Sequence, residues 1–204
     1  MLLKLEDYER IYKVINSVIK NEGSDPLKSC IMFSAYGAYI LSHYYNIDAQ
    51  PKAGLAAYHV GGDNVVLLFG EKQGEYYTGK GNAFHCWVEA EGWVIDFMTP
   101  EFVEIKNQPV LIPAYMFQKP ISTMRNSLLQ VKKVGDFFLE STPETTAKHM
   151  RILTEESIYG QLAEICIQWF TVPPTEIQSI FSNVGDYGKQ NRINLTGHKI
   201  VGAW

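Results

Sequence analysis

The chain has 204 residues, of which 46% are apolar and 13% aromatic, and its net charge is -4. This length fits one domain with a sizeable core, and the apolar content argues against a disordered chain. The acidic balance argues against a nucleic-acid partner, since Lys132-Lys133 is the only adjacent basic pair.

The N-terminus and the cysteines bear on cellular location. The first seven residues include acids where a signal peptide would need an apolar stretch, and no apolar run approaches the roughly 18 residues of a membrane span. Three widely spaced cysteines do not form a disulfide framework. We therefore predict a reducing, cytoplasmic location, no membrane contact and free thiols.

Two helices are predicted at the start of the chain. Residues 6–21 place apolar side chains at helical spacing, which indicates an amphipathic helix. Residues 29–45 leave almost no polar face, so this second helix is expected to run through the core. Ser29 is the candidate N-cap, which would put Cys30 at the first helical position.

The middle of the chain has the pattern of strands. Short segments rich in β-branched and aromatic residues are separated by turns such as 61–64 and Glu91-Gly92. The predicted strands are 53–60, 65–69, 83–90, 93–97, 110–118 and 134–139.

The C-terminal third is predicted to return to helix. The segments are 155–170 and the stretch from Pro173-Pro174 to about residue 183, whereas 185–204 carries few signals. No repeat or linker divides the chain. The order of helices, mostly antiparallel strands and helices predicts an α+β fold in a single domain over residues 1–204.

Cys30 is the candidate nucleophile. A thiol attacks as the thiolate, which is favoured at a helix N-terminus and by a neighbouring imidazole that accepts the proton. The N-cap argument supplies the first condition. The chain must then supply a base.

His85 and Asp96 are predicted to complete the site. If Glu91-Gly92 is a two-residue turn, Ala90 faces Trp93, and His85 and Asp96 become diagonal neighbours on one face of the hairpin. Asp96 could then orient the imidazole and stabilise its charged form. A three-residue turn would put the two side chains on opposite faces.

These motifs resemble the transglutaminase-like core of the cysteine proteinase-like enzymes. The resemblance rests on a Cys at the head of a buried helix, on His-Cys-Trp-Val-Glu at 85–89, on Gly-Trp-Val-Ile-Asp at 92–96 and on Thr99-Pro100. It covers about residues 25–105 and points to a bacterial family of that superfamily. It implies a Cys helix packed on an antiparallel sheet with His and Asp on successive strands, and residues 106–204 would be a C-terminal extension. No Gly-x-Cys or Gly-Gln-Cys signature precedes Cys30, so only its backbone N–H is offered as an oxyanion donor.

The leading functional hypothesis is a thiol-dependent hydrolase or acyltransferase. Cys30 would attack an amide or ester of a peptide, protein or small molecule and form a thioester, with His85 and Asp96 as partners and without a cofactor. A binding or scaffold protein that keeps the fold is the alternative. A zinc site from Cys30, His85 and Asp96 or His59 is a third hypothesis, but no Cys-x-x-Cys or His-x-x-x-His spacing supports it.

The remaining cysteines and histidines have structural interpretations. Cys86 should point away from the His85 face and Cys166 lies in an apolar helix, so both are expected in the core. His59 could border the site, although a structural or surface role is favoured. His43, His149 and His198 have no partner visible in the sequence.

Overall fold

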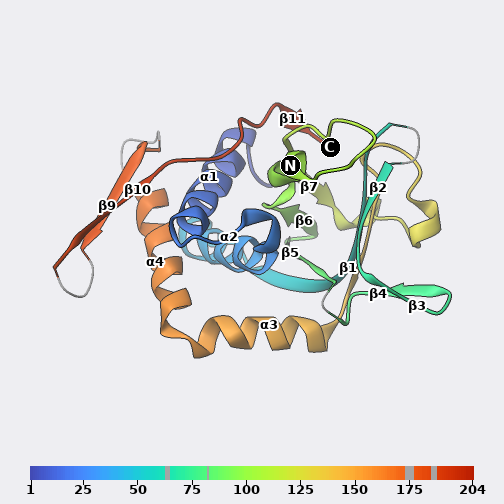
Figure 1. Ribbon diagram of the computed structural model, residues 1–204, viewed down its shortest axis with the longest axis horizontal. Coiled ribbons are helices and arrows are strands. Elements are labelled where there is room, and N and C mark those ends of the chain that lie inside the picture. Colours follow the sequence, from blue (N-terminus) through green and yellow to red (C-terminus); the bar gives the residue numbers. More distant parts are fainter. Residues whose placement is uncertain (63–64, 82, 173–176, 185–187) are drawn as a thin grey trace.

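The molecule is built on a curved, mostly antiparallel sheet; α1, α2 and α4 lie on one side of it, and α3 runs along its lower end (Figure 1). The computed structural model describes residues 1–204 except for 63–64, 82, 173–176 and 185–187. The sheet has the strand order β11-β7-β6-β5-β1-β2, and β8 pairs with β1 as well. Only β11 and β7 are parallel among these pairs.

The helices are α1 (Leu5–Asn21), α2 (Cys30–Tyr45), α3 (Pro143–Glu155) and α4 (Ser157–Thr171), with 3-10 turns at η1 (Pro26–Lys28), η2 (Thr99–Glu104), η3 (Ile121–Thr123) and η4 (Leu128–Gln130). The sheet strands are β1 (Ala49–Gly61), β2 (Val65–Phe69), β5 (His85–Ala90), β6 (Trp93–Asp96), β7 (Tyr115–Pro120), β8 (Phe137–Ser141) and β11 (Gly202–Ala203). Two small hairpins add β3 (Glu71–Gln73) with β4 (Tyr76–Thr78), and β9 (Ile180–Val184) with β10 (Gln190–Asn194).

Helices α1 and α2 confirm the two predicted N-terminal helices. The apolar stripe of α1 is buried, and α2 packs against α1, α4 and the strands β1 and β5. An apolar side chain on every face of α2 fits a helix with neighbours on most sides. The mixed α+β architecture predicted from the order of patterns is confirmed.

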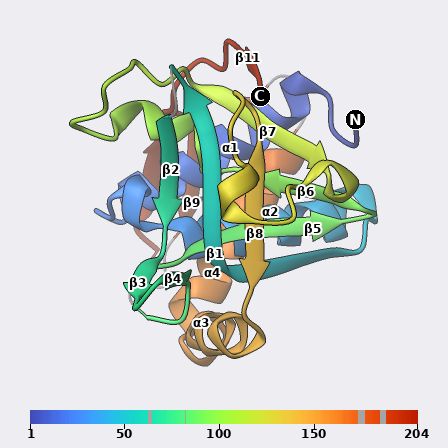
Figure 2. The ribbon, with the colours of Figure 1, turned by 90° about the vertical axis from the view of Figure 1, so that its right-hand side faces the viewer.

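Strand β1 is the longest in the sheet and organises it. Its first half pairs with β5, and its second half pairs with β8 and β2, between which it lies in Figure 2. It begins four residues before the predicted segment. Because of these pairings, β5 and β6 are held in the interior of the sheet, and the side chains near their ends are buried.

The part of the chain beyond residue 105 departs from the prediction in several places. Helix α4 matches the predicted helix over 155–170, but α3 precedes it without having been foreseen. The helix predicted toward residue 183 is wrong, because 180–184 forms β9 of a hairpin; residues 173–176, where that helix was to begin, lie outside the described residues. The predicted strand over 110–118 forms only from Tyr115. Part of the turn predicted at 61–64 also lies outside the described residues.

None of the helices in the described part of the chain has the length and apolar character needed to span a membrane.

Candidate active site

Cys30 is the first residue of α2, as the N-cap argument predicted. Ser29 occupies the N-cap position, but its hydroxyl donates to the carbonyl of Asp25 at 2.8 Å instead of capping the helix. The capping interaction expected from Ser29 is therefore wrong, although its position is right. The backbone N–H groups of the first turn receive no side-chain cap, so their partial positive charge favours an anion at Cys30.

The β5–β6 hairpin has the predicted two-residue turn. Glu91 and Gly92 both have positive φ, at 47° and 80°, as a type I′ turn requires. Ala90 pairs with Trp93, and the pairing continues to Val88 opposite Ile95. The register expected from the sequence is confirmed.

This register brings His85 and Asp96 into contact. The Nε2 atom of His85 lies 2.6 Å from Oδ2 of Asp96, and each side chain is only 1% exposed. The second carboxylate oxygen accepts the backbone N–H of Met98 at 3.0 Å. Both oxygens of Asp96 thus have donors, which fixes the orientation of the imidazole.

Helix α1 holds the end of β6 in place. The Tyr8 hydroxyl donates to the carbonyl of Asp96 and lies 3.1 Å from the hydroxyl of Thr99, which bonds to the same carbonyl. A buried network of hydrogen bonds to the backbone carbonyl of Asp96 therefore ties the end of β6 to α1.

The thiol of Cys30 lies beside this pair. It is 8% exposed, and the imidazole of His85 and the thiol of Cys86 are close enough to lower its pKa. Because Nε2 of His85 is engaged by Asp96, Nδ1 is the atom left for Cys30. Cys30, His85 and Asp96, predicted from three separate elements, are brought together in one buried cluster.

The electrostatics of this cluster favour a thiolate–imidazolium pair. The hydrogen bond from Cys86 and then the charge and hydrogen bond of His85 lower the pKa of Cys30 to about 5, although burial and Asp96 oppose this. Burial alone would lower the pKa of His85, but Asp96 and Cys30 raise it to about 10. Between those two values the cysteine is negative and the histidine positive.

Cys86 is a functional neighbour that the sequence interpretation missed. It is buried, as expected, but its thiol contacts Cys30 and Ser34 on α2. Burial and then the hydrogen bond to Cys30 raise the pKa of Cys86 well above its ordinary value. Strand alternation correctly separates Cys86 from His85, but it carries no information about α2, which packs on β5.

Aromatic side chains surround His85. Its ring stacks on Phe69 with centroids 4.5 Å apart and meets the ring of Tyr58 edge-on at 5.7 Å. Burial raises the pKa of Tyr58 well above its ordinary value, and the nearby Asp96 carboxylate raises it further. These contacts come from β1 and β2, and their aromatic content was the only signal in the sequence.

The other singled-out residues lie elsewhere or play other parts. Cys166 is buried in α4, where burial raises its pKa, and His198 lies 3.2 Å from Glu104. His59 is 2% exposed, so the surface role is excluded, and neither ring nitrogen has a hydrogen-bond partner among the described residues. His149 is also buried and packs on Phe84, directly before His85.

A grouping of three or more His, Cys, Asp or Glu side chains suited to hold a metal ion does not occur within the described ranges. The third hypothesis, a zinc site at Cys30, gains no support from the geometry.

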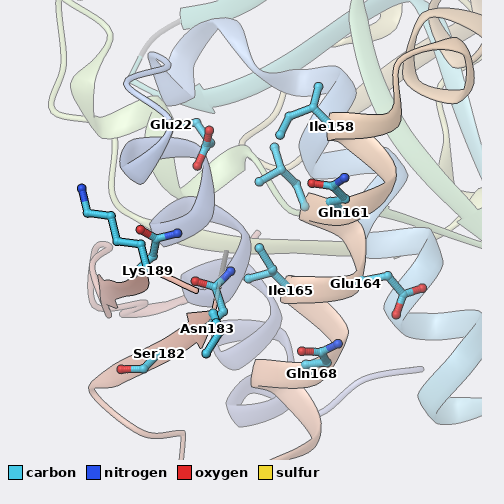
Figure 3. A pocket seen from close by; sticks show the side chains of 12 residues that line it. Glu22, Ile158, Gln161, Glu164, Ile165, Gln168, Ser182, Asn183 and Lys189 are labelled. Atoms are coloured by element: carbon cyan, nitrogen blue, oxygen red, sulfur yellow. The ribbon is translucent and has the colours of Figure 1, made fainter. Parts of the chain in front are cut away.

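A large hollow lies away from this cluster. It has a volume of about 780 Å³ and lies between α4 and the β9–β10 hairpin, with Gln161, Ile165 and Asn183 among its labelled walls (Figure 3). Of the described residues that line it, none is Cys or His. A smaller hollow of about 220 Å³ is lined by Ser29 and Ile31, the two neighbours of Cys30.

Fold and site together define a mixed α+β protein with a buried thiol–imidazole–carboxylate cluster. The chain belongs to the family described as "Protein of unknown function (DUF2026)", which matches residues 4–204. It is similar to a solved structure described as "The crystal structure of genomics APC5867", with 43% identity, a TM-score of 0.90 and coverage of 100% of this chain and 98% of that one. No curated protein matches the sequence.

Proposed function

We propose that this protein is a thiol-dependent hydrolase or acyltransferase that acts on an amide or ester bond through Cys30, His85 and Asp96. One observation carries the proposal. The Cys30 thiol at the start of a helix lies close enough to His85 for the imidazole to lower its pKa, and His85 is hydrogen-bonded to the Asp96 carboxylate.

The chemistry follows from the order of these groups. The Cys30 thiolate attacks the carbonyl carbon, and the protonated His85 gives its proton to the leaving amine or alkoxide as the thioester forms. His85 then takes a proton from water or from an acceptor amine, which breaks the thioester and restores the thiolate. Water makes the protein a hydrolase, and an amine makes it a transferase.

Asp96 and the helix terminus supply the electrostatic part. Asp96 keeps the imidazole oriented and stabilises the imidazolium. The N–H of Cys30 in the uncapped first turn of α2 is the proposed oxyanion donor, because it points along the helix axis toward the developing charge.

We also propose that residues 25–105 form a transglutaminase-like core, with 106–204 as its extension within one domain. The support is a Cys helix packed on an antiparallel sheet with His and Asp on successive strands. A peptide, protein or small amide or ester is the proposed substrate, and a reducing cytoplasm the proposed location. Nothing in this core requires a cofactor.

The burial of the cluster favours a second candidate, a binding or scaffold protein that keeps the fold without turnover. His85 and Asp96 are each 1% exposed, and Cys30 is 8% exposed. Such a protein would keep the ion pair as a structural feature and would process no amide or ester.

Limiting iodoacetamide between about pH 4 and pH 10 tests the nucleophile, with the labelled cysteine mapped by mass spectrometry. The expected result is preferential labelling of Cys30 that rises through about pH 5 and is weakened by His85→Ala. Labelling that rises only near the free-thiol value of about 8.5 would contradict the activated thiolate and leave the binding protein as the conclusion.

A further inference from the structure

The small hollow of about 220 Å³ lies at the end of α2 that carries the proposed nucleophile. One wall comes from the start of α2, where Ser29 and Ile31 flank Cys30 in the chain. The facing wall comes from Leu153 on α3 and Tyr159 on α4. His149, another lining residue, is close enough to Cys30 for the charge of that cysteine to act on its pKa, so the hollow and the thiol are near one another.

His149 on α3 lines the same hollow and lacks a partner. It is 8% exposed, and neither of its ring nitrogens has a hydrogen-bond partner in the described part of the chain. A buried polar group without a partner is unfavourable by about 1–3 kcal/mol, so native proteins rarely keep one without a reason. A ligand with a polar atom in this hollow would supply the missing hydrogen bond.

The position of His149 connects the hollow to the proposed site. Its ring stacks on Phe84 with centroids 4.0 Å apart, and Phe84 directly precedes His85. Burial, followed by the charge of Lys148, lowers the pKa of His149, so the ring is neutral at neutral pH. A neutral imidazole offers one donor and one acceptor to a ligand.

Size and lining select the ligand. The volume equals roughly seven water molecules at about 30 Å³ each, which suits a side chain of leucine or phenylalanine size. Four apolar residues, Ile31, Met32, Ile152 and Leu153, form one part of the lining, while Ser24, Lys28, Ser29, His149 and Tyr159 supply polar atoms. An apolar body with one hydrogen-bonding group fits this combination.

We propose that this hollow is the acyl-group subsite, which binds an apolar side chain on the acyl part of the ester or amide, beside a polar atom that hydrogen-bonds to His149. This inference rests on the proposed function and names its substrate class. The substrates are acyl compounds that resemble an N-blocked hydrophobic amino acid.

With such an ester the reaction has two steps, acylation of Cys30 and hydrolysis of the thioester. The Cys30 sulfur forms a bond to the acyl carbon, the ester C–O bond breaks, and the leaving oxygen takes the proton held by His85. Water then gives its proton to His85 and its oxygen to the acyl carbon, and the C–S bond breaks. The products are the free acid and the alcohol or phenol.

Two probes that differ only in the side chain test the inference: the p-nitrophenyl esters of N-acetylleucine and N-acetylglycine. The measurement is the rate of p-nitrophenol release, with acylated Cys30 identified by mass spectrometry. We expect the leucine ester to react at least ~10-fold faster in kcat/KM, the range that a filled apolar pocket gives.

Variants then localise the preference. Met32→Trp fills the hollow and should bring the ratio of the two rates close to one, while the exposed Leu129→Trp should leave it unchanged. His149→Gln keeps a donor and an acceptor, whereas His149→Phe removes both and should raise KM for both esters with a smaller change in kcat. Far-ultraviolet circular dichroism establishes that each variant is folded. If Met32→Trp does not fold, Leu153→Phe is used as the second variant that fills the hollow.

The outcomes separate the two proposals. Acylation of Cys30 with no preference for leucine, or with a preference that both filling variants retain, would overturn the subsite and leave the thiol chemistry standing. Absence of acylation by either ester, together with an ordinary thiol titration of Cys30, would overturn the proposed function and the subsite with it.

Discussion

Helices α2 and α4 each carry a buried cysteine, and the two thiols show how strongly the surroundings of a thiol affect its pKa. Cys30 and Cys166 are both less than a tenth exposed. Burial is the sole cause acting on Cys166, and it raises the pKa of that thiol. At Cys30 the same penalty is overcome by Cys86 and His85, and the pKa falls to about 5.

The comparison indicates that polar partners lower the pKa of a buried thiol, whereas burial alone raises it. Cys30 is at the N-terminus of its helix, where the dipole favours an anion, whereas Cys166 lies well inside α4 with apolar neighbours. Each difference between the two helices can be tested by a pair of substitutions.

The largest effect is expected from removal of the thiols. Cys30→Ala should lower ester turnover by at least ~10³-fold, because a covalent step cannot be replaced by water at the same site. Cys166→Ala should keep turnover near that of the parent. The measurement is p-nitrophenol release from a p-nitrophenyl ester, with thermal unfolding as the control for folding; equal turnover by the parent and Cys30→Ala would remove Cys30 from the mechanism.

Asp96→Asn should lower kcat/KM by roughly 10²–10⁴-fold while the side chain keeps its shape. The Asp96 carboxylate raises the pKa of His85, so its loss lowers that pKa from about 10. In the parent, kcat/KM should rise with pH through about 5 and fall near about 10; in the variant the fall should move to lower pH.

Exposed Glu140→Gln on β8 is the matched control, since it removes a carboxylate that is not among the groups that shift the pKa of His85. If kcat/KM of Asp96→Asn fell at the same high pH as in the parent, the role of Asp96 as the partner of His85 would be contradicted.

Cys86→Ala should raise the pKa of Cys30 from about 5 toward the free-thiol value of about 8.5, because it removes the hydrogen bond that contributes most to the depression. Cys86→Ser restores a donor of similar size and should keep the pKa nearer to that of the parent. Thiolate absorbance followed against pH measures the change. Identical midpoints for the Ala and Ser variants would show that the depression comes from His85 and the helix alone.

The part of the site that the sequence predicts is the part set by local geometry. The Glu91-Gly92 turn fixes the register of β5 and β6, and this register alone places His85 against Asp96. The start of α2 at Cys30 likewise follows from the break before it and the apolar run after it. Both inferences need only neighbours along the chain or across one turn.

The rest depends on packing between distant segments. Cys86 reaches Cys30 because α2 crosses β5, and His149 reaches Phe84 because α3 packs on β1. Neither contact leaves a periodic pattern in the sequence. The β9–β10 hairpin was missed because its strands are mostly exposed and polar, so the alternation that marks a half-buried strand is weak.

The smallest expected effects concern glycines in the same two helices. A Cβ at Gly37 of α2 would lie 2.3 Å from the ring of Phe97, whereas one at Gly160 of α4 would meet no atom within 4 Å. Gly37→Ala should therefore lower the free energy of unfolding by about 1–3 kcal/mol through overpacking, despite the better helix propensity of alanine. Gly160→Ala should raise it by about 0.5–1 kcal/mol.

Urea denaturation of both variants measures these changes as shifts in midpoint at constant slope. Opposite signs are expected because Gly37 of α2 is pressed against the ring of Phe97, while Gly160 of α4 faces open space. If Gly37→Ala were also stabilising, α2 would have room to move relative to the sheet. The contact of Cys30 with His85 and Cys86, on which the low pKa of Cys30 depends, could then not be held in place by packing.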